Sequence, residues 1–229
     1  MQISEIFYSL QGEGRLTGMR SVFIRLAGCN LRCWWCDTPY ALTASSGREQ
    51  DIRQVLDQIA TWDTPYVVVT GGEPLIAKDL PELLAELKSA GKHITVETAG
   101  TRYVEISCDL LSISPKLAHS TPPADHAFAA YADSHEKQRI QTDVLQRYID
   151  TYDYQLKFVV STVGDLAEIE ALLSRLHNVQ REQVMLMPQG RTKADLRRTG
   201  PQVARWCLEN NFSYCPRLQI ELWGNKKGT

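Results

Sequence analysis

The chain has 229 residues, enough for one domain that buries roughly 70% of its unfolded surface and too few for two full-sized domains. Its 43% hydrophobic residues include no apolar run near the ~20 residues that span a bilayer. Lys and Arg number 25 against 27 Asp and Glu, so the charge does not indicate nucleic-acid binding. The N-terminal segment MQISEIFYSLQGEG lacks the regions of a secretory signal, and we expect a cytoplasmic protein without a membrane partner.

Apolar periodicity predicts strands and helices in alternation along the chain. The predicted strands are Ser21–Leu26, Tyr66–Thr70, His93–Glu97, Leu110–Ser114, Gln155–Val160, Gln183–Met187 and Arg217–Leu222. Helices are predicted over Ile52–Ile59, from a starting box at Asp79 and Glu82 to a cap at Gly91, and near Asp165–Leu176 and Pro201–Asn210.

This order predicts an α/β fold with a parallel sheet wrapped by helices. A complete eight-fold barrel takes ~250 residues, so we expect a partial (β/α) barrel of about six parallel strands with a reduced helix set. We expect a single domain over residues 1–229. Residues 117–154 break the pattern, since Pro122 and Pro123 mark a turn and the polar run Ser134–Gln141 is expected to be solvated, and we interpret them as an insertion.

Cysteine spacing points to a metal cofactor. Three of the six cysteines follow the pattern Cys-x3-Cys-x2-Cys within eight residues: Cys29, Cys33 and Cys36. Structural zinc takes four protein ligands, so a zinc site would have to recruit a distant histidine or another cysteine. A cubane iron–sulfur cluster can instead leave one iron for a small molecule. We interpret the remaining cysteines as small buried hydrophobic residues: Cys108, Cys207 and Cys215.

The cysteine spacing, with Trp35 before the last cysteine, resembles the signature of radical S-adenosylmethionine enzymes. The resemblance implies a [4Fe-4S] cluster whose fourth iron binds the amino and carboxylate groups of S-adenosylmethionine, and whose reduced form cleaves the sulfonium to a 5'-deoxyadenosyl radical. Gly71-Gly72-Glu73-Pro74 follows a predicted strand and resembles the superfamily's segment that meets the methionine moiety. Glycines there permit close backbone approach, and Glu73 can accept a hydrogen bond from the ammonium group.

Three further segments resemble the 7-carboxy-7-deazaguanine synthase family: EIFYSLQGEG at residues 5–14, Cys36-Asp37-Thr38, and LWGNKKGT at residues 222–229. The resemblance spans nearly the whole chain. It implies conversion of 6-carboxy-5,6,7,8-tetrahydropterin to 7-carboxy-7-deazaguanine with loss of ammonia, a step toward queuosine, and regeneration of S-adenosylmethionine. It also implies Mg²⁺, an electron donor such as flavodoxin or ferredoxin, and a homodimer.

The same resemblance implies roles for individual residues. Arg25 would hold the substrate carboxylate, and a tail over 216–229 would close over the substrate. The implied substrate contacts are Leu10, Gln11, Gly12, Arg25, Thr70 and Thr229 with its terminal carboxylate. The implied cofactor contacts are Trp35, Asp37, Gly72, Glu73, Ser114, Pro115, Lys116, Met187, Pro188, Gln189 and Gly190. Thr38 would bind Mg²⁺, no residue is assigned as a catalytic acid or base, and Gln219 occupies the place of a histidine in many relatives.

Two alternatives stay open at the level of sequence. A different radical enzyme, such as an activase that makes a glycyl radical on a protein partner, would share the cysteine loop but differ in its N-terminal and tail motifs. A zinc-binding module without enzymatic activity would be colourless and hold stoichiometric zinc. A brown protein with about four irons would exclude the zinc module.

Overall fold

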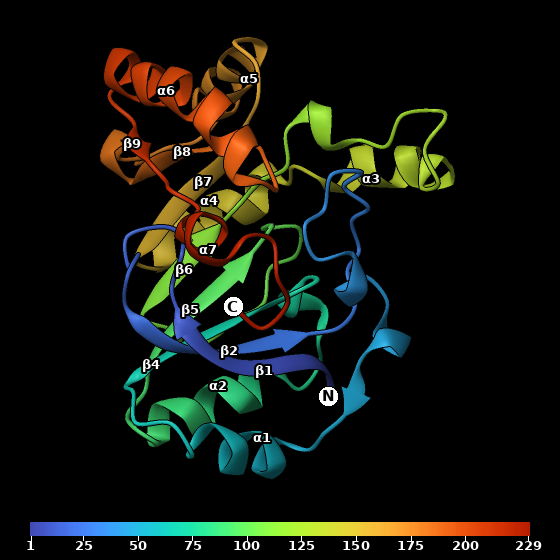
Figure 1. Cartoon of the computed structure of the whole chain (residues 1–229), viewed down its shortest axis with the longest axis vertical. Helices are drawn as coiled ribbons and strands as arrows, with labels where there is room; N and C mark the ends of the chain where they lie inside the picture. The colour runs from blue at the N-terminus through green and yellow to red at the C-terminus, as the bar shows by residue number, and fades with distance from the viewer.

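Nine strands form one sheet in the order β3-β1-β2-β4-β5-β6-β7-β8-β9 in the computed structural model, which describes residues 1–229 (Figure 1). The strands are β1 (Gln2–Leu10), β2 (Arg20–Leu26), β3 (Arg48–Glu49), β4 (Tyr66–Gly71), β5 (His93–Thr98), β6 (Leu110–Ile113), β7 (Tyr154–Val160), β8 (Val184–Pro188) and β9 (Ser213–Tyr214).

The sheet is parallel from β2 to β9, while β1 pairs antiparallel with both β2 and β3. The two edge strands, β3 and β9, are two residues long and do not pair with each other. The sheet therefore stays open, which confirms the prediction of a partial barrel. Its parallel part has one strand more than the six expected, because the chain adds the short strand β9 beside β8.

Helices connect most of the parallel strands, whereas residues 99–109 join β5 to β6 without a helix. The helices are α1 (Ile52–Ile59), α2 (Leu80–Ser89), α3 (Ala132–Gln138), α4 (Thr142–Thr151), α5 (Gly164–Leu173), α6 (Lys193–Asn210) and, after the last strand, α7 (Leu218–Trp223). Figure 1 shows α1 and α2 together at the β1–β4 end of the molecule, and α5 and α6 at the β7–β9 end. None of these helices combines the length and the hydropathy that a bilayer-spanning helix needs.

Three sequence predictions differ from the structure near helix ends. Helix α6 begins at Lys193 rather than near Pro201, because Thr192 caps it by accepting from the backbone N–H of Asp195 at 3.1 Å, and Pro201 lies inside the helix. Asp79 makes no side-chain cap for α2 and instead lies 3.3 Å from the N-terminal ammonium. Helix α5 ends at Leu173, three residues before the predicted end.

The predicted strand Arg217–Leu222 was wrong, since these residues form helix α7. The last ladder bond of this region runs from the backbone N–H of Cys215 to the carbonyl of Leu186, and Pro216 then has no N–H to continue the ladder. An apolar residue at every second position suits a strand only if one face is covered. Of the apolar residues in this stretch only Ile220 is buried, so the apparent alternation does not correspond to a covered sheet face.

The segment 117–154 contains more structure than the sequence indicated. The polar run within it is largely helix α3, and His135 in that helix is buried. Helix α4 supplies the crossover between parallel strands β6 and β7. The prediction of a solvated stretch holds for Ser134, Glu136 and Lys137, which are exposed. It fails for His135 and Gln138, because their side chains contact the cysteine loop.

The two faces of the sheet differ in chemistry. On β7, Leu156 and Phe158 point into a core of 36 buried residues that the crossover helices cover. Gln155 and Lys157 alternate with them and are also buried, but they lie on the opposite face. Parallel strands covered on both faces are usually apolar throughout, so the polar face is expected to serve a ligand.

Candidate active site

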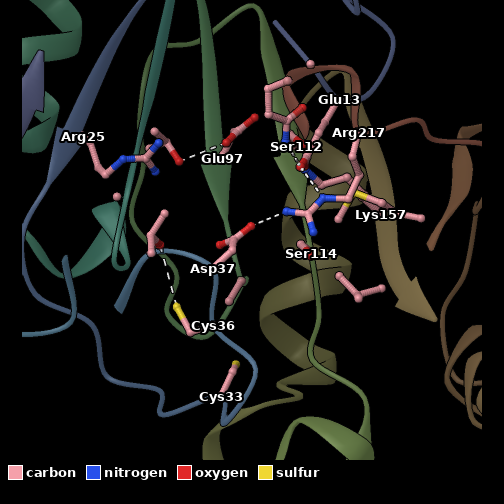
Figure 2. Close-up of a pocket in the computed structure, with 18 of the residues that line it drawn as sticks. Glu13, Arg25, Cys33, Cys36, Asp37, Glu97, Ser112, Ser114, Lys157 and Arg217 are labelled. Carbon is pink, nitrogen blue, oxygen red and sulfur yellow. Dashed lines mark hydrogen bonds and ion pairs between the residues drawn. The ribbon is translucent and has the colours of Figure 1, made fainter. Parts of the chain in front are cut away.

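Polar side chains lie at one level across five neighbouring strands of the sheet. Arg25 on β2 is in register with Thr70 on β4, and Ser112 on β6 is in register with both Glu97 on β5 and Gln155 on β7. Thr70 Oγ1 donates to Glu97 Oε2 at 2.9 Å, and Gln155 Nε2 donates to Ser112 Oγ at 2.8 Å. These residues form a polar row, and all of them except Gln155 line a large pocket. Figure 2 labels three of them: Arg25, Glu97 and Ser112.

The three clustered cysteines line one end of this pocket: Cys29, Cys33 and Cys36. Burial raises the pKa of Cys29 to about 11 and that of Cys33 to about 12, because a thiolate is less stable away from water. Iron binding must therefore displace protons from these thiols. The other three cysteines do not line the pocket. One of them, Cys215, accepts a hydrogen bond from the backbone N–H of Gly14.

The structure does not form the ligand set of a single zinc ion. No group of three His, Cys, Asp or Glu side chains surrounds one ion-sized point. A cubane differs in this respect, because each cysteine binds its own iron and the sulfurs need not converge. The donor chemistry of three pocket-lining thiols without a fourth therefore fits the cluster and not the zinc module.

The segment between β6 and β7 contacts the loop that carries Cys29, Cys33 and Cys36, which we call the cysteine loop. Both tryptophans of the loop donate to the carbonyl of His119, Trp34 at 2.8 Å and Trp35 at 3.2 Å. The Nδ1 of His135 accepts from the backbone N–H of Arg32 at 3.1 Å, and its Nε2 lies 2.9 Å from Ser120 Oγ. The sequence did not indicate this role, because the contacts join positions up to 103 residues apart.

Acidification should weaken the contact between α3 and the cysteine loop, because it protonates His135, which is 1% exposed. Burial lowers the pKa of His135 from 6.5 to about 4. The unfolded chain takes up the proton first as the pH falls, so the stabilisation is complete above pH 6.5 and is lost as the pH falls toward 4. From pH 7 to pH 4, the free energy of unfolding of the parent chain should fall on the order of 3 kcal/mol more than that of His135→Gln.

Urea unfolding at a series of pH values measures this difference. His177→Gln provides a matched control, because His177 is exposed. Equal losses in the parent chain and in His135→Gln would contradict the assignment.

The glycine pair after β4 serves the packing of the cysteine loop. A Cβ at Gly72 would lie 2.1 Å from the carbonyl oxygen of Gly28, and the backbone N–H of Glu73 donates to that oxygen at 2.8 Å. Only glycine allows the two backbones to approach this closely. The Glu73 carboxylate accepts from Thr98 Oγ1 at 2.7 Å and from the N–H groups of Ala99 and Leu75.

Most residues singled out in the sequence come together around the pocket. Those that line it are Leu10, Gln11, Gly12, Arg25, Trp35, Asp37, Thr38, Thr70, Gly72, Ser114, Lys116, Met187, Gln189, Gly190 and Thr229, together with the three cysteines. Three do not line it: Glu73, Pro115 and Pro188. Glu73 is 1% exposed and lies behind the glycine pair.

Aromatic rings and one arginine form the end of the pocket at β1 and β2. Phe7 and Phe23 stack with centroids 4.8 Å apart, and the Arg25 guanidinium lies 5.8 Å from the Phe7 centroid. Arg25 Nε donates to Glu5 Oε1 at 2.7 Å, and Tyr40 OH donates to the same oxygen at 2.8 Å. The two Nη nitrogens of Arg25 have no protein acceptor, which leaves them free for an anionic ligand.

A buried group of charges forms the opposite wall, as Figure 2 shows. Glu13 contacts both Lys157 and Arg217, and Arg217 also contacts Asp37. Burial alone would raise the pKa of Glu13, but the two cations lower it to about 2. Four charged residues of the pocket were not predicted from the sequence: Glu13, Glu97, Lys157 and Arg217. A signal was available for Glu97 and Lys157, since each is a charged residue within a strand that otherwise reads as buried.

The profile of the Radical SAM superfamily matches residues 23–199 of the chain. The 7-carboxy-7-deazaguanine synthase of Rhodopirellula baltica is 45% identical over 229 residues, which cover 99% of this chain and 88% of that protein. The enzyme of the same name from Halobacterium salinarum is 40% identical over 238 residues, with 100% of this chain and 93% of that protein covered.

A solved structure agrees with these similarities. The crystal structure of QueE from Escherichia coli superposes with a TM-score of 0.68 and 25% sequence identity, covering 93% of this chain and 92% of that one. A structure of TYW1 superposes with a TM-score of 0.58 at 12% identity, which reflects the shared fold alone.

Proposed function

Because the chain belongs to the 7-carboxy-7-deazaguanine synthase family of the radical SAM superfamily, we propose that its pocket contracts the ring of 6-carboxy-5,6,7,8-tetrahydropterin to 7-carboxy-7-deazaguanine and releases ammonia. The observation that carries the proposal is one pocket lined by three cysteines at one end and by a polar row with an arginine at the other. The enzyme is a carbon–nitrogen lyase that uses a [4Fe-4S] cluster and S-adenosylmethionine.

The cysteine end of the pocket would hold both cofactors. Cys29, Cys33 and Cys36 would bind the cluster, and residues of the same wall, among them Trp35, Asp37 and Lys116, would contact S-adenosylmethionine. When bound, these cofactors supply the radical that starts the ring contraction. Glu73 does not line the pocket, and three of its roughly four acceptor positions are occupied within the protein, which argues against the expected contact with the ammonium group.

The polar row would bind the pterin. Arg25 offers two Nη nitrogens to the substrate carboxylate while Glu5 and Phe7 fix its stem. Glu97 accepts from Gln11 at 3.1 Å and from Thr70, and its carboxylate suits the paired N–H donors at the pyrimidine edge of the pterin. The protein's part in the reaction is thus orientation and the exclusion of water, and no protein group is assigned as general acid or base.

Anaerobic reconstitution tests this proposal. Iron-loaded protein supplied with S-adenosylmethionine, a reductant, Mg²⁺ and the carboxylated tetrahydropterin is expected to form a deazaguanine chromophore and an equal amount of ammonia. S-Adenosylmethionine should not be consumed, because it is regenerated. Cleavage of S-adenosylmethionine without a deazaguanine product would contradict the proposed synthase activity and favour another radical enzyme.

Thr38 is the proposed protein ligand to Mg²⁺, an ion that prefers hard oxygen donors and keeps water or substrate oxygens in its shell. Its hydroxyl lies at the pocket wall, 3.7 Å from Cys36 Sγ. Thr38→Ala should raise the magnesium concentration needed for half-maximal turnover about ten-fold and leave S-adenosylmethionine binding nearly unchanged. An unaltered magnesium titration would rule out this ligand, and Thr43→Ala, on a neighbouring exposed turn, is the control.

The remaining expectations concern partners and surroundings. We propose a homodimer, an electron donor of the flavodoxin or ferredoxin kind, and a cytoplasmic location. We also propose that the chain is a single radical SAM domain, that within residues 117–154 the part before crossover helix α4 is an insertion that supports the cysteine loop, and that the tail over 216–229 closes over the substrate. The tail proposal is supported by Thr229 at the pocket wall and by Lys227 Nζ, which lies 4.8 Å from the Tyr40 ring centroid.

A further inference from the structure

Arg217 joins three segments that are distant in the sequence. Its Nε donates to Glu13 Oε1 at 3.2 Å, its Nη1 contacts the carbonyl of Gly190, and its Nη2 contacts Asp37 Oδ2. Its side chain is only 6% exposed and lines the pocket between these partners (Figure 2). Each contact comes from a different nitrogen of the planar guanidinium, whereas the three donors of an ammonium group all lie on one nitrogen.

Asp37 depends on this contact for its orientation. Its side chain makes no other hydrogen bond or ion pair, and it is 38% exposed. It follows Cys36 directly, so its carboxylate lies on the turn that carries the last cysteine. We propose that Arg217 is a positioning residue that holds Asp37 in the direction required for S-adenosylmethionine, which rests on the function proposed above.

The charges around Arg217 allow its effect on S-adenosylmethionine binding to be distinguished from an effect on the stability of the fold. Glu13 also contacts Lys157, a buried lysine on β7, and accepts from Gln219 Nε2 at 2.8 Å. Removal of the Arg217 guanidinium therefore leaves Glu13 paired, whereas it leaves Asp37 with no partner. The loss should fall on the cofactor end of the pocket rather than on the fold as a whole.

Equilibrium dialysis of S-adenosylmethionine against the protein with an oxidised cluster measures binding without turnover. Arg217→Gln should raise the dissociation constant about ten-fold or more, the range of a lost charge-assisted hydrogen bond. If Arg217 acts through Asp37, Arg217→Gln should add little to the effect of Asp37→Asn in the double variant. Arg15→Gln is the matched control. Arg15 lies two residues after Glu13, and its substitution removes an exposed ion pair with Asp153.

Several results would overturn the proposal. Parent-like binding by Arg217→Gln would do so, and so would full additivity of the two substitutions. Should Arg217→Gln unfold, Arg217→Lys keeps the charge next to Glu13, and parent-like binding by that variant would equally refute the role. If the parent chain itself bound no S-adenosylmethionine, the proposed function would fail together with this inference. If the parent chain bound it and the variant bound it equally well, only the inference about Arg217 would fail.

Discussion

Cys33→Ala is expected to abolish both cluster assembly and product formation. Only three cysteines line the pocket as ligands to the cluster, so the loss of one leaves two, and no other cysteine is there to replace it. Turnover should fall by more than about a thousand-fold, because the radical chemistry depends entirely on the cofactor. Iron and sulfide analysis after anaerobic reconstitution, together with the product assay, measures the effect.

The matched control for this substitution is Cys108→Ala. Cys108 is partly buried, and it lies outside the pocket. This variant should bind about four irons and keep its activity, whereas Cys33→Ala should lose both while retaining the thermal transition of the metal-free parent chain. A Cys33→Ala protein with a full complement of iron would show that another residue supplies a ligand, which would contradict a cluster held by three cysteines alone.

Replacement of Arg25 should give the second largest effect, confined to the substrate. Arg25 and Glu5 are both largely buried, with side chains 15% and 10% exposed, so Arg25→Met alone would leave a carboxylate held only by Tyr40. The double variant Arg25→Met with Glu5→Gln avoids that charge. Its kcat/KM for the pterin should be about 10²- to 10³-fold lower than that of Glu5→Gln alone, as expected for a buried charge pair with the substrate carboxylate.

The same pair of variants should bind S-adenosylmethionine with equal affinity, because Arg25 lies on β2, at the polar row and not among the residues assigned to the cofactor. A substrate analogue without the carboxylate should discriminate little between them. Equal kcat/KM values for the carboxylated pterin in the two variants would remove Arg25 from the substrate site.

The parallel sheet could be predicted because its strands carry a clear apolar pattern. Tyr66–Gly71 and Tyr154–Val160 are buried runs bounded by turns, and the helices between strands show spaced apolar residues over a covered face. The prediction of Arg217–Leu222 as a strand failed because local alternation carries no information about whether the neighbouring strand has a free edge. Pro216 was the local signal that the ladder ends there.

The active site could be predicted only where residues adjacent in the sequence act together. The cysteine loop and the Gly-Gly-Glu-Pro turn are such cases, and the structure adds that Gly72 packs against Gly28. The pairing of Glu13 with Lys157 joins residues 144 positions apart, and that of Arg217 with Asp37 joins residues 180 apart. No periodicity encodes such contacts, because they depend on how the loops cross above the sheet.

Electron–nuclear double resonance on the reduced protein with ¹⁵N-labelled S-adenosylmethionine measures whether the open iron of the cluster binds the amino group of this ligand. We expect a strong coupling between the cluster and the labelled amino nitrogen, and no ¹⁵N coupling when the label is omitted. A cluster with no such coupling, or one whose fourth iron is coordinated by a protein side chain, would contradict it.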